Sequence, residues 1–305
     1  MKQIKVGRIR YLNTLPFYHG LESWPDSESG IQLQWEKGTP AEINQKIHAG
    51  KIDLAPISSL EYLNHQDDYL LLPHLCIGSQ DFSGSVLFFS RERIQGLDRA
   101  TVSLTQDSLS AAALLRILLK LKFRFNNEFL VEPTHPQEML AKSKGCLLIG
   151  DEALFFQPKE FLYKTDLSQL WWEWTNLPFC FSVWAVRKKF YREQPEAVKT
   201  FCRRLKSNTE KNLQDIEKLL REGLDMTIVD EKFPTAFGYL FNLNYSFDAD
   251  MQKGLLHFFD LACELGISPP ARKLEFIGTA PSTSATPRGG SASGGNPLRK
   301  SYGPL

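Results

Sequence analysis

The 305-residue sequence predicts an α/β fold of two lobes, joined by two extended strands that cross between them. Short β-rich runs alternate with helical patterns from the N-terminus, which is typical of α/β proteins with parallel sheets. A second series of the same kind begins near residue 100, and two longer β-rich runs, 85–90 and 179–188, separate the two series. Strands that cross between lobes can act as hinges around a ligand cleft. In the alternative interpretation, both runs are central strands of a single sheet.

The first series runs to residue 63. We expect strands at 4–11, 31–36 and 52–56, and helices at 16–21, 40–49 and 58–63. Asn13 and Thr14 are favoured helix N-cap residues, and Pro16 fits the first turn of a helix because it has no N–H to lose. Ser58 and Glu61 have the spacing of a capping box.

The second series begins with a strand at 100–105, followed by an Ala/Leu-rich helix that opens at Ser108 or Ser110. The segment 145–154 reads as a strand, a glycine and the start of a helix that carries Asp151 in its first turn. The two halves of the chain therefore repeat one architectural theme.

The C-terminal part of the chain is predicted to be helical from residue 194, with a final helix at 248–267. The last residues are rich in Ser, Thr, Gly and Pro and lack apolar periodicity, so we expect disorder there. The expected organisation is a first lobe formed by 1–88 and 186–278, a second lobe formed by 89–185, and a disordered tail at 279–305.

The composition excludes several classes of function. Lys and Arg (36) nearly balance Asp and Glu (35), so no broad positive field favours nucleic acid or an anionic membrane as partner. The five cysteines form no CxxC pair and the six histidines are scattered, so we expect neither a disulfide framework nor a metal site. The N-terminal residues lack a signal-peptide pattern, which favours a cytoplasmic protein. There is no Walker A, GxGxxG or GxSxG motif.

The candidate site consists of small polar residues where strands lead into helices. In an open α/β sheet the carboxyl ends of the strands border the ligand crevice, and helix N-termini attract anions. Each such residue alone is more often a helix cap than a ligand contact, but two facing lobes would direct four junctions at one cleft. The four junctions contain Asn13 and Thr14; Ser58 and Ser59; Thr105, Ser108 and Ser110; and Gly150 with Asp151. Such a cleft suits a small carboxylate.

Two further groups of residues have open interpretations. Asp151 and Glu152 are candidates for acid–base chemistry, but acidic residues in a first helical turn are also favoured by the helix dipole. The structural interpretation is preferred for Glu152 and is evenly balanced for Asp151. Trp171, Trp172 and Trp174 suggest either an aromatic wall of the cleft or packing between lobes, and packing is the default.

Several motifs together resemble the chorismate dehydratase family of the futalosine route to menaquinone. They are "GRIRYLNTLPFYHGLE", "KGTPAEINQKIHAGKIDLAPISSLEYL", "LLPHLCIG", "SVLFFSR", "LLIGDEAL" and "DLSQLWWEWTNLPFCFSVWAVRK". The resemblance extends from about Val6 to the final helix. It implies a fold similar to type II periplasmic solute-binding proteins, and the loss of water from chorismate to give 3-[(1-carboxyvinyl)oxy]benzoate without a metal or organic cofactor. Asn176 stands where the family pattern has Gly, and Asn tolerates a left-handed turn.

The resemblance also implies roles for individual residues. Asn13 of "YLNTLP" is expected in the reacting region, where an amide positions the substrate better than it removes a proton. Ser85 of "SVLFFSR" is expected to face the cleft, and Asp151 is the alternative base. The remaining substrate-binding candidates are Ser58, Ser59, Thr105, Ser108, Ser110 and Gly150. A dicarboxylate substrate also brings a base of its own. The rival functions are the related enzyme that forms 1,4-dihydroxy-6-naphthoate and a non-catalytic solute-binding protein.

Overall fold

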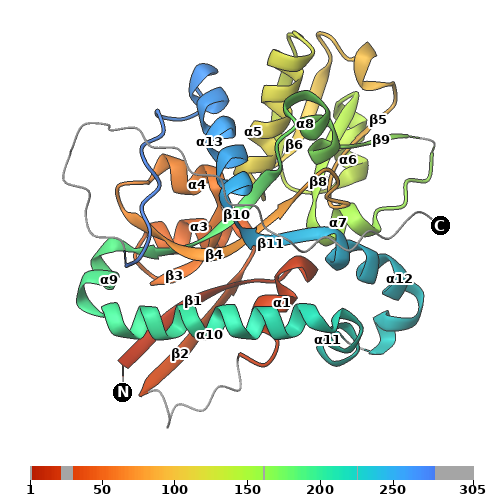
Figure 1. Ribbon diagram of the computed structural model, residues 1–305. Helices are drawn as coiled ribbons and strands as arrows, with labels where there is room; N and C mark the ends of the chain where they lie inside the picture. The colour runs from red at the N-terminus through yellow and green to blue at the C-terminus, as the bar shows by residue number, and fades with distance from the viewer. Residues whose placement is uncertain (1, 22–29, 161, 225, 279–305) are drawn as a thin grey trace.

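The computed structural model describes residues 2–21, 30–160, 162–224 and 226–278, and it contains two β-sheets that belong to two lobes (Figure 1). The first sheet has the strand order β11-β4-β10-β3-β1-β2. Its strands are β1 (Lys2–Ile9), β2 (Ile31–Gly38), β3 (Leu54–Ser58), β4 (Tyr69–Ser79), β10 (Phe179–Arg187) and β11 (Leu243–Phe247). β1 pairs in parallel with β2 and β3, whereas β10 and β11 run antiparallel to their neighbours.

The second sheet has the order β7-β6-β8-β5-β9. Its strands are β5 (Val86–Ser90), β6 (Thr101–Thr105), β7 (Glu128–Glu132), β8 (Gly145–Ile149) and β9 (Tyr163–Asp166). β6 is parallel to β7 and β8, and β5 is antiparallel to β8 and β9. The α/β class is confirmed, but both sheets are mixed rather than parallel. In each sheet the first strand after the chain crosses from the other lobe, β5 or β10, runs antiparallel to its neighbours.

Helices cover both sheets. In the first lobe they are α1 (Leu15–Tyr18), α3 (Pro40–His48) and α4 (Ser59–Asn64); in the second they are α5 (Leu109–Ile117), α6 (Pro136–Lys142), α7 (Gly150–Phe155) and α8 (Leu167–Thr175). The C-terminal helices are α9 (Lys188–Glu193), α10 (Pro195–Gln214), α11 (Ile216–Gly223), α12 (Met226–Asn242) and α13 (Ala249–Glu264). Figure 1 shows α10 running along the bottom of the first lobe, where it contacts α1. No described helix has the length and apolar character needed to cross a membrane.

The chain passes between the sheets through short connections and not through the two strands that the sequence suggested. All of β5 lies in the second sheet and all of β10 lies in the first. By sheet membership the changeovers therefore fall at 80–85 and 176–178, a few residues from the expected boundaries at 88 and 185. The second changeover begins with Asn176 in the left-handed conformation (φ 54°), as predicted for a turn that Gly or Asn can make.

The largest hydrophobic core extends across both lobes. Trp171 of α8 is fully buried in it, where it packs edge-on against Phe179 and Phe258 and donates its indole N–H to the carbonyl of Pro178 at 3.3 Å. The packing interpretation is therefore confirmed for Trp171. The cysteines are free thiols, four of them buried. The predicted disordered tail, 279–305, lies outside the described residues.

Candidate functional site

A cleft lies between the lobes, where the carboxyl ends of β1, β3, β6 and β8 come together. Its lining consists of Ile9, Tyr11, Asn13, Thr14, Pro40, Ser58, Ile77, Ser85, Val86, Ser108, Ile149, Gly150, Phe181, Ser182 and Leu243. The four strand-to-helix junctions predicted from the sequence therefore each contribute a residue. The cavity measures about 60 Å³, which is space for about four water molecules.

Asn13 lies in the cleft with an unsatisfied polar atom. It belongs to the short 3₁₀ turn Leu12–Thr14 that follows β1. Its carbonyl accepts a hydrogen bond from the Tyr245 hydroxyl at 2.8 Å, which fixes the backbone. Its side-chain Oδ1 is buried and has no partner among the described residues. Buried polar atoms are almost always paired, so an unpaired one in a cleft is a position for a ligand.

Thr14 does not cap the helix that it precedes. It occupies the N-cap position of α1 with Pro16 in the first turn, as predicted, but no backbone N–H of the helix bonds to its side chain. Instead its Oγ1 donates to the carbonyls of Ile9 (2.9 Å) and Tyr11 (2.7 Å). The hydroxyl therefore ties the turn back onto the end of β1.

Ser58 and Ser108 line the cleft from opposite lobes, and each caps a helix. Ser58 Oγ accepts the N–H of Glu61 at 3.2 Å, at the N-terminus of α4. Ser108 Oγ accepts the N–H of Ala111 at 3.2 Å, at the N-terminus of α5. The capping box expected at Ser58 is only half formed, because the Glu61 carboxylate accepts the Tyr69 hydroxyl instead. Both serines accept through Oγ, which leaves each O–H able to donate to a ligand.

Ser85 faces the cleft, as predicted. It bonds to Tyr239, a residue that the sequence did not indicate. Its Oγ donates to the Tyr239 hydroxyl at 2.8 Å, and both groups are buried. Burial raises the pKa of Tyr239 above its usual value, while hydrogen bonds from the Ser85 and Asn13 side chains act in the opposite direction. Tyr239 is therefore a neutral phenol that links the two predicted cleft residues. It comes from α12, and no motif around it in the sequence indicated this position.

Ser59 and Ser110 are brought together, but outside the lining of the cleft. Their Oγ atoms are 2.9 Å apart across the contact between α4 and α5. Ser59 donates its O–H to the carbonyl of Cys180 at 2.8 Å, so Ser110 must supply the proton between the two hydroxyls. Ser110 Oγ also accepts the N–H of Leu60 at 3.0 Å. Neither hydroxyl proton remains for a ligand.

Thr105 is likewise engaged away from the cleft lining. Its Oγ1 is 2.6 Å from Thr134 Oγ1, and Thr134 donates to Asp107 at 2.8 Å. Thr105 is therefore the donor to Thr134, and its Oγ1 also accepts the N–H of Asp107. These bonds shape the loop that leads from β6 to Ser108.

Gly150 allows Tyr11 to form a wall of the cleft. Gly150 has a φ of 61°, and a Cβ atom added to it would lie 2.8 Å from the Tyr11 ring. An L-residue would be strained at this φ and would push the ring away. Burial raises the pKa of Tyr11 above its usual value, and the charges of Glu152, Asp107 and Asp151 add to the effect. Tyr11 is thus a neutral phenol as well.

Asp151 is not among the residues that line the cleft. Its carboxylate accepts the N–H of Leu12, with Oδ1 at 3.0 Å, from across the lobe boundary. Burial raises its pKa to about 6, and the bond from Leu12 partly opposes this. Asp151 borders a neighbouring pocket of about 400 Å³ whose lining includes Arg8, Arg10 and Lys37. This pocket shares Ile9, Tyr11 and Thr14 with the cleft, so Asp151 lies beside the cleft without lining it.

The chemistry of the cleft is that of a neutral polar site. Among the described residues, its lining contains no carboxylate, imidazole, ammonium or guanidinium side chain. The polar groups are hydroxyls, an amide and the N-terminal ends of α4 and α5, all of which suit a bound carboxylate. The lining offers no strong base, so a reaction that removes a proton here needs one from elsewhere.

Comparison with known proteins identifies relatives of the chain. A family model described as menaquinone biosynthesis matches residues 4–264. A chorismate dehydratase from Thermus thermophilus is 32% identical over 210 residues, covering 62% of this chain and 72% of the relative. A chorismate dehydratase from Campylobacter jejuni is 27% identical over 192 residues, covering 62% and 70%.

Solved structures with the same architecture are more distant in sequence. The periplasmic aliphatic sulphonate-binding protein SsuA from Escherichia coli has a TM-score of 0.62 at 11% identity, covering 90% of this chain and 96% of that one. The protein AF1704 from Archaeoglobus fulgidus has a TM-score of 0.59 at 17% identity, covering 87% and 98%. At these identities the similarity concerns the fold, and it agrees with the two-lobed type II binding-protein architecture.

Proposed function

Because the chain belongs to the menaquinone biosynthesis family, we propose that it is a chorismate dehydratase, which converts chorismate to 3-[(1-carboxyvinyl)oxy]benzoate and water. The observation that carries this function is the similarity to two chorismate dehydratases over 72% and 70% of their lengths. The enzyme is a hydro-lyase. We further propose that the reaction belongs to the futalosine route and takes place in the cytoplasm.

The neutral cleft fits the substrate and the reaction. Chorismate is a dianion, and its two carboxylates match the O–H groups of Ser58 and Ser108 and the helix N-termini behind them. The reaction breaks the C–H bond at the ring carbon that bears the ether, and the C–O bond of the adjacent hydroxyl. The departing hydroxide and the proton together form water. Because the ring becomes aromatic, the site needs chiefly to orient the substrate and exclude bulk water.

The group that removes the proton can be inferred from the lining of the cleft. The cleft lining offers no carboxylate among the described residues, so we assign proton removal to the carboxylate of the substrate's own enolpyruvyl group. Asn13 Oδ1, which is buried and unpaired, positions the hydroxyl that leaves. Asp151 remains the alternative base, although its carboxylate already accepts the Leu12 N–H.

The other predicted substrate-binding residues divide into two groups. Ser85 and Gly150 line the cleft, and we propose that Ser85 contacts the substrate together with the Tyr239 hydroxyl. Ser59, Ser110 and Thr105 use their protons within the protein, so their proposed contribution is to hold the lobes and the loop before α5 in place.

The proposal is tested by incubating the purified chain with chorismate. We expect an ultraviolet-absorbing benzoate whose mass is that of chorismate less one water. Binding of chorismate without turnover would favour a solute-binding protein, which the fold also permits. Absence of both binding and turnover would reject the assignment of the substrate.

A further inference from the structure

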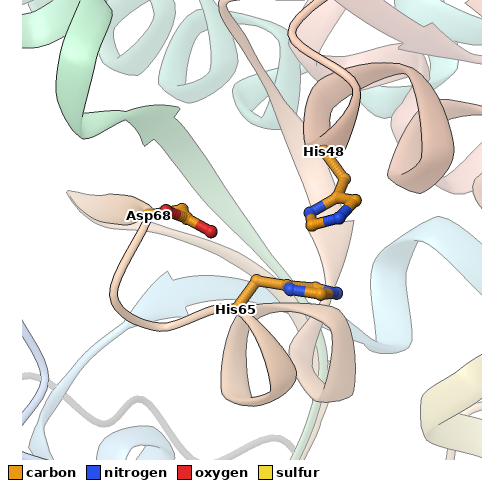
Figure 2. Close-up of side chains that lie close together, drawn as sticks. All are labelled: His48, His65 and Asp68. Carbon is orange, nitrogen blue, oxygen red and sulfur yellow. The ribbon is translucent and has the colours of Figure 1, made fainter.

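A second polar cluster lies on the first lobe, at the edge of the sheet opposite the cleft. It consists of His48, the last residue of α3; His65, which follows the last residue of α4; and Asp68 in the turn before β4 (Figure 2). The N-terminal ends of these two helices border the cleft through Pro40 and Ser58. The cluster therefore lies at the C-terminal ends of the same two helices.

The three side chains converge. One ligand atom from each lies within 4.8 Å of the ligand atoms of the other two. The imidazole rings of His48 and His65 have centroids 3.9 Å apart and are tilted by 36°. Figure 2 shows the two rings facing each other, with the Asp68 carboxylate directed toward them. Metal–nitrogen bonds are about 2.0–2.1 Å long, so the two rings would have to turn apart to direct one nitrogen each at a shared ion. His48 and Asp68 are exposed and His65 is partly exposed, which leaves room for this rotation.

The surroundings favour a cation. The C-terminal ends of two helices carry partial negative charge, and α3 and α4 both end here. The carboxylate of Glu61, which is buried, lies 3.8 Å from His65 Nε2 and accepts the Tyr69 hydroxyl at 3.3 Å. A fixed carboxylate beside a histidine is the usual outer partner of a metal-binding imidazole. The nearby Lys188 ammonium is bonded to Glu275 at 3.0 Å.

We propose that His48, His65 and Asp68 bind one divalent transition-metal ion such as Zn²⁺ or Ni²⁺. Two imidazoles and one carboxylate select these ions over Mg²⁺, which prefers oxygen ligands. The ion joins the ends of α3 and α4 on the face away from the reaction, so it stabilises the first lobe and takes no part in the dehydration. The sequence did not indicate this site, because the two histidines do not have the spacing of a known metal-binding motif and come together only in the fold.

The test uses the untagged chain after treatment with a chelator. Calorimetric titration with Zn²⁺ is expected to give one ion per chain, and added Zn²⁺ or Ni²⁺ to raise the Tm, since a ligand that binds only the folded state stabilises it. Mg²⁺ at the same concentration is expected to leave the Tm unchanged. His48→Ala and His65→Ala should each weaken Zn²⁺ binding at least about tenfold, and Glu61→Gln by about tenfold.

The matched control is His135→Ala. His135 is exposed on the second lobe, and its side chain makes no capping bond. This variant is expected to bind Zn²⁺ as the unchanged chain does. The site is rejected if the unchanged chain shows no increase in Tm with Zn²⁺, or if His48→Ala binds as tightly as His135→Ala. Because His48 is exposed, its variant decides the question even if His65→Ala does not fold.

Discussion

The carboxylate of Asp151 in the second lobe accepts the backbone N–H of Leu12 in the first, with Oδ1 at 3.0 Å and Oδ2 at 3.3 Å. Leu12 begins the turn that carries Asn13, whose side-chain oxygen is unpaired. The hydrogen bond therefore links the second lobe to the turn that holds Asn13. We therefore expect Asp151 to position this turn and another group to take the proton. The raised pKa of Asp151, about 6, makes the two roles separable by experiment.

Asp151→Asn is expected to retain dehydration and to change the dependence of stability on pH. Burial raises the folded-state pKa from 3.8 to about 6, so the folded chain binds the proton more tightly than the unfolded chain. Between those two pH values this group makes the wild type less stable as pH rises. The amide does not titrate but still accepts the Leu12 N–H. The free energy of unfolding of the variant should therefore rise relative to that of the wild type across this pH range, by at most about 3 kcal/mol above pH 6.

Urea unfolding at several pH values, together with kcat at neutral pH, measures both effects. The control is Glu264→Gln, an exposed carboxyl on α13, for which no such difference is expected. A loss of kcat by several orders of magnitude in Asp151→Asn, with unfolding unchanged, would identify Asp151 as the base after all.

Asn13→Ala is expected to lower kcat about 10²-fold while the chain stays folded. The side chain contributes an unpaired oxygen to the cleft and not a structural bond through that atom, so its loss affects orientation more than stability. Steady-state rates with chorismate and thermal unfolding of the same preparation provide the measurement. Asn64→Ala, at an exposed position at the end of α4, serves as the control. Full activity in Asn13→Ala would exclude the assigned role.

Ser85→Ala and Tyr239→Phe are expected to have non-additive effects. The two hydroxyls share one buried hydrogen bond of 2.8 Å, so either single change removes that bond and leaves the other hydroxyl buried without it. Each should cost about 1–3 kcal/mol in stability, and the double variant should be no worse than the more damaging single one. Unfolding free energies and KM for the four proteins complete the cycle. Strictly additive losses would mean that the pair does not act as a unit.

Much of the fold could be predicted from the sequence because local patterns determined it. Helix starts at Ser108 and Asp248 follow from side chains that cap their own helices. By sheet membership the changeovers fall a few residues from the expected lobe boundaries, because sheet membership depends on pairing between distant segments. β5 and β10 have continuous apolar patterns that would fit either sheet. The sequence of a strand that is buried on both faces does not indicate which strands it pairs with.

The residues of the site that could be predicted from the sequence are those at the ends of strands. Ser58, Ser108 and Gly150 follow strands, and the topology of the fold brings such positions together. Ser59 follows directly after Ser58 but turns toward Ser110, a direction that depends on how the helix packs. Tyr239 could not be found because it belongs to a helix far along the chain and precedes no strand-to-helix junction.

Gly150→Ala is expected to destabilise the chain and to impair substrate binding, whereas Gly238→Ala is not. At Gly150 a Cβ atom would lie 2.8 Å from the Tyr11 ring at a φ of 61°, so the left-handed backbone strain of about 1–2 kcal/mol adds to displacement of the cleft wall. At Gly238, within α12, nothing outside the adjacent residues and the nearby backbone of its own helix lies within 4 Å of the added Cβ. Replacing a helical Gly there should stabilise by up to about 1 kcal/mol. Unfolding free energies separate the two variants, and KM for chorismate should rise only in Gly150→Ala. Equal stability and equal KM in both would show that the close approach of Gly150 and Tyr11 does not shape the cleft.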